Sequence, residues 1–138
     1  MIRKQAVQET VLYYTPVQGP NVTKLKGVLV RMGIRIRNVA EEQTGETIGG
    51  LLGLPGYDVR QDPEAQPETS AEIRDEVLVM HNFSGYRIDE LLLNLRKAGV
   101  PKIHLKAVVT ETNCSWTFYQ LYKEIKEEHT RMQKSVME

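Results

Sequence analysis

An internal repeat is the feature that most constrains what this chain can fold into. With a constant shift of 66 residues and no gap, Val11–Ile34 lies over Val77–Val100. Identical pairs include Val11/Val77, Leu12/Leu78, Gly19/Gly85, Leu25/Leu91, Leu29/Leu95 and Gly33/Gly99. Further along the chain the alignment continues after small gaps: a shift of 69 residues aligns Arg37 with Lys106, and a shift of 70 aligns Thr47 with Thr117. Because both copies must satisfy the same packing, the repeat predicts two equivalent structural units.

Each copy is predicted to contain a strand, a helix, a second strand and a second helix. In the first copy, Val11–Tyr14 is a run of β-formers, and Asn21–Met32 carries apolar residues at helical spacing. Ile34–Val39 then alternates as a strand does. The second copy repeats this order, with strands over Glu76–Met80 and Ile103–Val109. The last helix is glycine-broken and short in the first copy, about residues 47–54, and long in the second.

Strands that alternate with helices predict an α/β fold with parallel strand pairs and right-handed crossovers. We expect a single domain over residues 1–138, with pseudo-repeats 11–54 and 77–129 joined by a linker or mobile loop over 55–74. The favoured architecture is one four-stranded, mainly parallel sheet of order 2-1-3-4 with helices on both faces. A two-fold-related pair of units, with strands 1 and 3 antiparallel, is the alternative.

In the doubly wound version of this fold, a ligand would bind at the topological switch point between strands 1 and 3. The loops that would form such a site are Thr15–Pro20 and His81–Tyr86.

Charge and cysteine content exclude several function classes. The chain has 18 basic and 18 acidic residues, and this balance argues against a nucleic-acid partner bound through counterion release. Cys114 is the single cysteine, so neither an intramolecular disulfide nor a paired-cysteine zinc site is possible. His81, His104 and His129 have no metal-ligand spacing, so no metal or cofactor is predicted. The chain has no signal-peptide pattern and no apolar membrane span, so we expect a soluble cytoplasmic protein.

The segment LKAVVTETNCSW runs from the last predicted strand into the last helix. Its recognisable positions are Leu105, Lys106, Ala107, Thr110, Asn113 and Trp116. This pattern resembles a small bacterial family described as domain of unknown function 3783, most clearly over Val77–Glu128. The resemblance implies a bacterial protein, and the family has no assigned activity to carry over.

The same segment supplies most of the candidate ligand-binding residues. Arg37 and Lys106 are basic groups near strand ends, a placement suited to a phosphate or carboxylate. The alternative is that their aliphatic stems cover apolar surface while the charges reach water. Asn113 or Ser115 is a candidate cap for the last helix, whose free N–H groups would suit an anion. The predicted ligand-binding residues are therefore Arg37, Lys106, Thr110, Asn113 and Trp116.

Three hypotheses follow. The favoured one is a non-catalytic α/β module that binds a small anionic ligand or a protein partner, including a second copy of itself. The second is an enzyme or redox protein with Cys114 as nucleophile and His81 as base, a weak catalytic set because nothing orients the pair. The third is a homodimeric interaction protein that docks through an aromatic patch on its last helix, formed by Trp116, Tyr119 and Tyr122.

Overall fold

A computed structural model describes residues 8–57 and 73–137 of the chain. Most of the predicted linker therefore lies outside the described residues. The four strands form one mixed sheet of order β2-β1-β3-β4. They are β1 (Thr10–Tyr14), β2 (Arg35–Asn38), β3 (Val77–His81) and β4 (Leu105–Val108). The α/β class and the 2-1-3-4 order are confirmed.

The central strand pair is antiparallel. β1 pairs with β2 in parallel and β3 pairs with β4 in parallel, whereas β1 and β3 run in opposite directions. This is the second of the two arrangements that the repeat allowed. The carboxyl ends of β1 and β3 therefore lie at opposite ends of the sheet. The predicted switch point, which required the loops Thr15–Pro20 and His81–Tyr86 to meet, is wrong for this reason.

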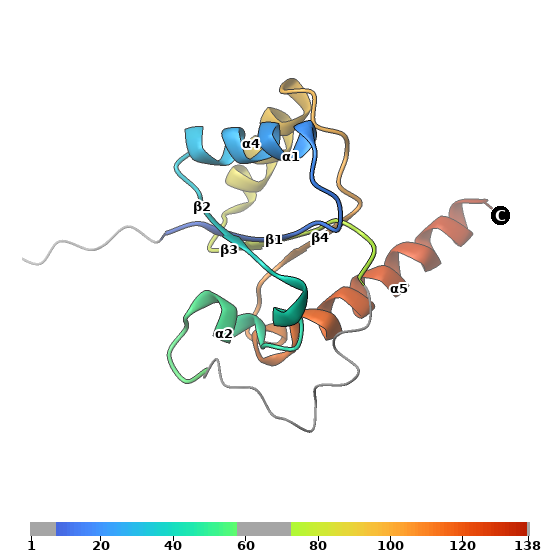
Figure 1. Ribbon diagram of the computed structural model, residues 1–138. Helices are drawn as coiled ribbons and strands as arrows, with labels where there is room; N and C mark the ends of the chain where they lie inside the picture. The colour runs from blue at the N-terminus through green and yellow to red at the C-terminus, as the bar shows by residue number, and fades with distance from the viewer. Residues whose placement is uncertain (1–7, 58–72, 138) are drawn as a thin grey trace, which may run out of the picture.

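Helices cover both faces of the sheet (Figure 1). α1 (Pro20–Arg31) and α4 (Gly85–Lys97) lie on one face, while α2 (Ile48–Leu52) and α5 (Phe118–Met137) lie on the other. Short 3-10 turns, η1 (Glu41–Gln43) and η3 (Asn113–Ser115), precede α2 and α5. Successive side chains in a strand point to opposite faces of the sheet, so alternate strand residues belong to two different apolar cores, one on each face.

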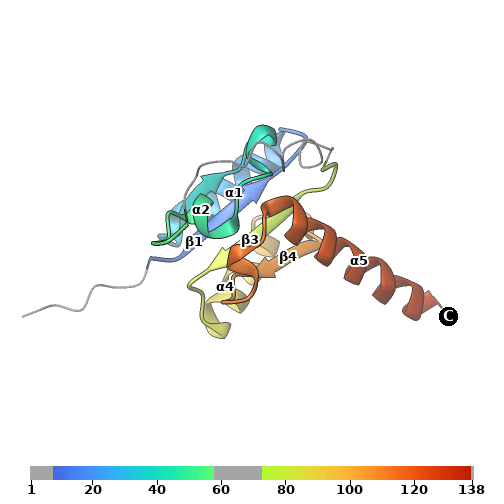
Figure 2. The ribbon, with the colours of Figure 1, turned by 90° about the horizontal axis from the view of Figure 1, so that it is seen from below.

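The core on the α1 and α4 side contains Val11, Tyr13, Leu78 and Met80, and the core on the α2 and α5 side contains Leu12, Tyr14, Val77 and Val79. Figure 2, seen from the α2 and α5 side, shows the α1–α2 half beside the α4–α5 half. None of the described helices combines the length and the apolar composition that crossing a membrane requires.

The register of the strands corrects the alignment of the repeat. Val39 N donates to Tyr13 O at 2.9 Å, and Val109 N donates to Met80 O at 2.9 Å. Tyr13 and Met80 are therefore equivalent residues, and they are 67 positions apart in the sequence. The shift that superposes β1 on β3 is thus 67 residues, one more than the shift of 66 in the sequence alignment. A one-residue shift moves a strand side chain to the opposite face.

The pairing of Arg37 with Lys106 across the repeat is therefore wrong. Arg37 pairs with Leu12 and Lys106 pairs with Leu78, and these two leucines belong to different cores. With the corrected register, the structural counterpart of Lys106 is Ile36.

Two contacts join residues that occupy the same position in each half. Leu12 pairs with Val79 at the centre of the sheet, and Thr47 forms an antiparallel bridge with Thr117. The bridge has two matched hydrogen bonds: Ile48 N donates to Trp116 O at 2.8 Å, and Phe118 N donates to Glu46 O at 3.0 Å. Residues that meet their own counterparts lie on a local two-fold axis, so the two halves pack around such an axis.

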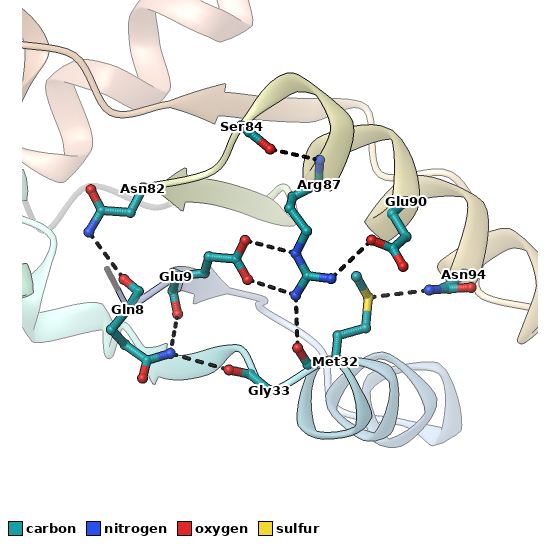
Figure 3. A network of polar contacts seen from close by, with 9 residues as sticks. All are labelled: Gln8, Glu9, Met32, Gly33, Asn82, Ser84, Arg87, Glu90 and Asn94. Atoms are coloured by element: carbon teal, nitrogen blue, oxygen red, sulfur yellow. Dashed lines mark hydrogen bonds and ion pairs between the residues drawn. The ribbon is translucent and has the colours of Figure 1, made fainter. Parts of the chain in front are cut away.

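Arg87 links the two halves near the start of β1 (Figure 3). Its guanidinium donates to both carboxylate oxygens of Glu9, at 2.8 and 2.7 Å, and to Glu90 Oε1 at 3.0 Å. It also donates to Met32 O at 2.8 Å, at the carboxyl end of α1. This bidentate arrangement ties α4 to α1 and to the residue that precedes β1, and it raises the pKa of the Arg87 guanidinium.

Candidate functional site

Lys106 lies inside a cavity between α4 and the β4 edge of the sheet. Its neighbour on β3, Leu78, belongs to the core on the α1 and α4 side, so the Lys106 side chain is on that face. The cavity has a volume of about 340 Å³ and is lined by Leu92, Leu95, Arg96, Val100, Pro101, Lys102, Ile103 and Lys106. We call this cavity the Lys106 pocket.

The end of α4 shapes the pocket. Val100 N donates to Leu95 O at 3.0 Å, and Gly99 has a φ of +87°, the left-handed conformation that ends a helix. Pro101 follows and prevents the helix from resuming. The chain therefore turns back under α4, and its apolar residues form the walls.

The charged groups around the pocket are all cations. They are Arg96, Lys102 and Lys106, and none of the carboxylates in the described residues lines the cavity. In the part of the chain that the structure describes, the ion pairs are formed by Arg87 and Lys126 and involve none of the three. Burial lowers the pKa of Lys106, and the charge of Lys102 lowers it further. An anion beside Lys106 would stabilise this poorly solvated ammonium.

Arg37 lies away from this pocket. It is exposed on β2, the edge strand at the opposite side of the sheet from β4, and on the other face. The structure does not bring Arg37 and Lys106 together.

Thr110, Asn113 and Trp116 are brought together in the turn that leads into α5. Asn113 N donates to Thr110 Oγ1 at 3.1 Å, and Thr110 N donates to Asn113 Oδ1 at 2.9 Å. Asn113 Nδ2 also donates to Val108 O at 3.0 Å, and Asn113 is buried. Trp116 packs against the core on the α2 and α5 side. These contacts account for the spacing of the three residues, since each holds the turn in place.

Cys114 lies in the same turn, within η3 rather than at the start of α5. Its Sγ is 2.9 Å from Tyr57 Oη and donates to Glu111 O at 3.4 Å. Among the described residues, His81 is not one of its hydrogen-bonding partners. His81 ends β3, and burial lowers the pKa of its imidazole. In the described part of the chain, no cluster of histidine, cysteine and acidic side chains is suited to a metal ion.

A second cavity, of about 530 Å³, lies at the carboxyl ends of β1 and β2. The chain leaves β1 for α1 on one face and leaves β2 for α2 on the other, which is the geometry of a ligand-binding crevice in α/β sheets. Lys26, Arg74 and Glu41 contribute charges of both signs to its lining. The structure therefore has a crevice of this type between β1 and β2, whereas the sequence predicted one between β1 and β3.

Sequence reasoning found Lys106 but missed Arg96 and Lys102. The available signal was the run of basic residues around the end of α4, where Arg96 and Lys102 flank Gly99, Val100 and Pro101. An amphipathic pattern alone does not show that the chain beyond the helix folds back beneath it.

Comparison with known protein families finds a match in the second half of the chain. A family described as a domain of unknown function (DUF3783) matches residues 76–132. This range runs from the residue before β3 into α5 and contains the whole lining of the Lys106 pocket. No curated protein matches the chain, and no solved structure does.

Proposed function

We propose that this protein, whose residues 76–132 match the family described as a domain of unknown function (DUF3783), is a soluble, cytoplasmic, non-catalytic α/β module that binds a small anionic ligand. The Lys106 pocket is the proposed binding site.

One observation carries the proposal: a cavity with three cations and no carboxylate in its lining, one of the cations being a partly buried lysine. Keeping an ammonium in apolar surroundings is unfavourable unless it gains a partner. Lys106 donates to Ile103 O, and an ammonium has three donors, so further hydrogen bonds to a ligand are available. Hydrogen bonds between charged groups are roughly twice as strong as those between neutral groups.

The proposal is tested by NMR titration of the full chain with sodium acetate, sodium phosphate and sodium octanoate at constant ionic strength. We expect at least one of these anions to shift the amide resonances of Val100, Lys102 and Ile103 in a saturable way. Lys106→Met should abolish the shifts, and the matched control Arg37→Met should retain them. The proposal fails if none of the anions shifts these resonances, or if Lys106→Met retains the shifts.

A second candidate function is docking of another copy of the chain through α5. The observation that favours it is that α5 continues beyond the sheet (Figure 1). Met132, in the second half of this helix, is 61% exposed. Sedimentation velocity at several concentrations would reveal a dimer that Met132→Lys dissociates. A monomer at all concentrations would reject this function.

A further inference from the structure

The shape and chemistry of the Lys106 pocket indicate what kind of anion it takes. We infer that its ligand is an amphipathic anion, an aliphatic monocarboxylate whose head group meets Lys106 and whose chain lies in the pocket. This inference rests on the proposed function and specifies the ligand class of the same site.

The walls of the pocket are suited to a hydrocarbon chain. Leu95, Val100 and Ile103 are 5%, 7% and 4% exposed, and Leu92 is half-buried above them. A volume of about 340 Å³ accommodates roughly ten groups of the size of a water molecule or a methylene. An inorganic phosphate or an acetate would leave most of this apolar surface uncovered.

The position of the charges indicates where the head group lies. Arg96 and Lys102 are exposed at the mouth, where water and salt weaken the attraction of a bare anion. Lys106 is half-buried, and its attraction to a carboxylate becomes stronger when water is excluded from around the two charges. A carboxylate that carries a hydrocarbon chain would exclude this water. The arrangement therefore selects for a charge and an apolar chain in one molecule.

The first half of the chain provides an internal control for this argument. At the position of Lys106 it has Ile36, which packs against the core on the α1 and α4 side. At the position of Arg96 it has Val30. The same framework is therefore built with apolar residues at both places, so folding alone does not require the two cations in the second half.

The experiment is a titration series of acetate, butanoate, hexanoate and octanoate into the full chain, followed by NMR and isothermal calorimetry. Each methylene that enters the pocket should tighten binding about fourfold, since its burial is worth about 0.8 kcal/mol. Octan-1-ol and inorganic phosphate are the matched controls, because each carries only one of the two features. Both should bind at least tenfold more weakly than octanoate.

Variants locate the two parts of the ligand. Lys106→Met should weaken octanoate binding at least tenfold, and Leu92→Glu should do the same by placing a carboxylate in the lining. Leu93 is the next residue of α4, and its side chain is exposed. Leu93→Glu should therefore leave the affinity for octanoate unchanged. The amide spectrum of each free variant verifies that the fold is intact.

The outcomes separate this inference from the proposed function. If affinity is independent of chain length yet still lost in Lys106→Met, the module binds anions and the amphipathic ligand class is wrong. If octan-1-ol binds as tightly as octanoate, the pocket is merely apolar, and both ideas fail. If no member of the series shifts the pocket resonances, both fail as well.

Discussion

The two halves of the molecule share backbone and helix-cap hydrogen bonds but differ in the length of their last helix and in the side chains at some corresponding positions. Ile34 N donates to Leu29 O at 2.9 Å, and Val100 N makes the same bond to Leu95 O at 3.0 Å. Thr47 Oγ1 accepts from Gly50 N at 3.0 Å, and Thr117 Oγ1 accepts from Gln120 N at 3.0 Å. These matched contacts involve residues at corresponding positions of the two halves. They also show that helix ends and caps are the shared framework.

The differences are concentrated in two places. The first half ends in α2, which has five residues, whereas the second ends in α5, which has 20. On the sheet face that α1 and α4 cover, Ile36 of β2 in the first half is replaced by Lys106 of β4 in the second. Residues that agree between the halves are those that folding needs, whereas residues that differ are where a specific function is to be sought.

The largest expected effect tests the shared core. Phe118 and Ile48 are counterparts, and both are fully buried in the core on the α2 and α5 side. Phe118→Ala should lower the free energy of unfolding by about 3–5 kcal/mol, and Ile48→Ala by about 2–5 kcal/mol, through lost burial and the cavity left behind. Urea denaturation of both variants measures this. Equal stability of either variant and the wild type would contradict the shared core.

The next effect distinguishes the halves. Arg87 ties α4 to Glu9 and Met32, whereas its counterpart Asn21 is exposed at the start of α1. Arg87→Met should destabilise the fold by about 1–3 kcal/mol, because it removes hydrogen bonds between charged groups and leaves the Met32 carbonyl without this donor. Asn21→Ala is the matched control and should change stability by less than about 0.5 kcal/mol. Similar losses in both would show that the Arg87 link is not specific.

A smaller and equal effect is expected at the two helix ends. Gly33 and Gly99 have φ angles of +75° and +87°, which side chains with a Cβ adopt at a penalty. Replacing either residue by alanine should lower the free energy of unfolding by about 1–2 kcal/mol. Neither new Cβ would meet an atom closer than the 3.6 Å contact with Lys24 Nζ at Gly99. A difference of more than about 1 kcal/mol between the two variants would argue against equivalent helix ends.

The smallest effect is a pH dependence confined to the second half. Burial lowers the pKa of His81, while its counterpart Tyr14 has its pKa raised, away from neutral pH. As pH falls through 6.5, the unfolded chain takes up a proton that folded His81 resists, so stability should decrease below that value. Chemical denaturation between pH 8 and 5 should show a shallower slope for His81→Gln. An unchanged slope would rule out His81 as the cause.

The sequence predicted the helices and their ends well because those signals are local. Apolar spacing marked α1 and α4, and the glycines after them do lie in the left-handed conformation. The orientation of β1 against β3 was not predictable. It depends on a long connection, and both orientations bury the same apolar strands.

The sequence also did not predict correctly which face of the sheet each strand residue occupies. The ungapped alignment paired Arg37 with Lys106, but strand side chains alternate, and a register that differs by one residue separated them. Lys106 was identified as a candidate because it is a basic residue near a strand end, a placement suited to a phosphate or carboxylate. Its pocket was not, because the pocket depends on how the turn after α4 packs beneath the helix.

The antiparallel pairing of β1 with β3 has a consequence for how the chain folds. Each parallel pair closes over one short crossover helix, whereas β1 ends at residue 14 and meets β3 only at residue 77. The entropy lost when a loop closes increases with the number of residues in the loop. Contacts within a half therefore form with a smaller loss of entropy than contacts between the halves. We therefore expect two nuclei, one in each half, followed by a docking step at the Leu12–Val79 pair that limits the folding rate.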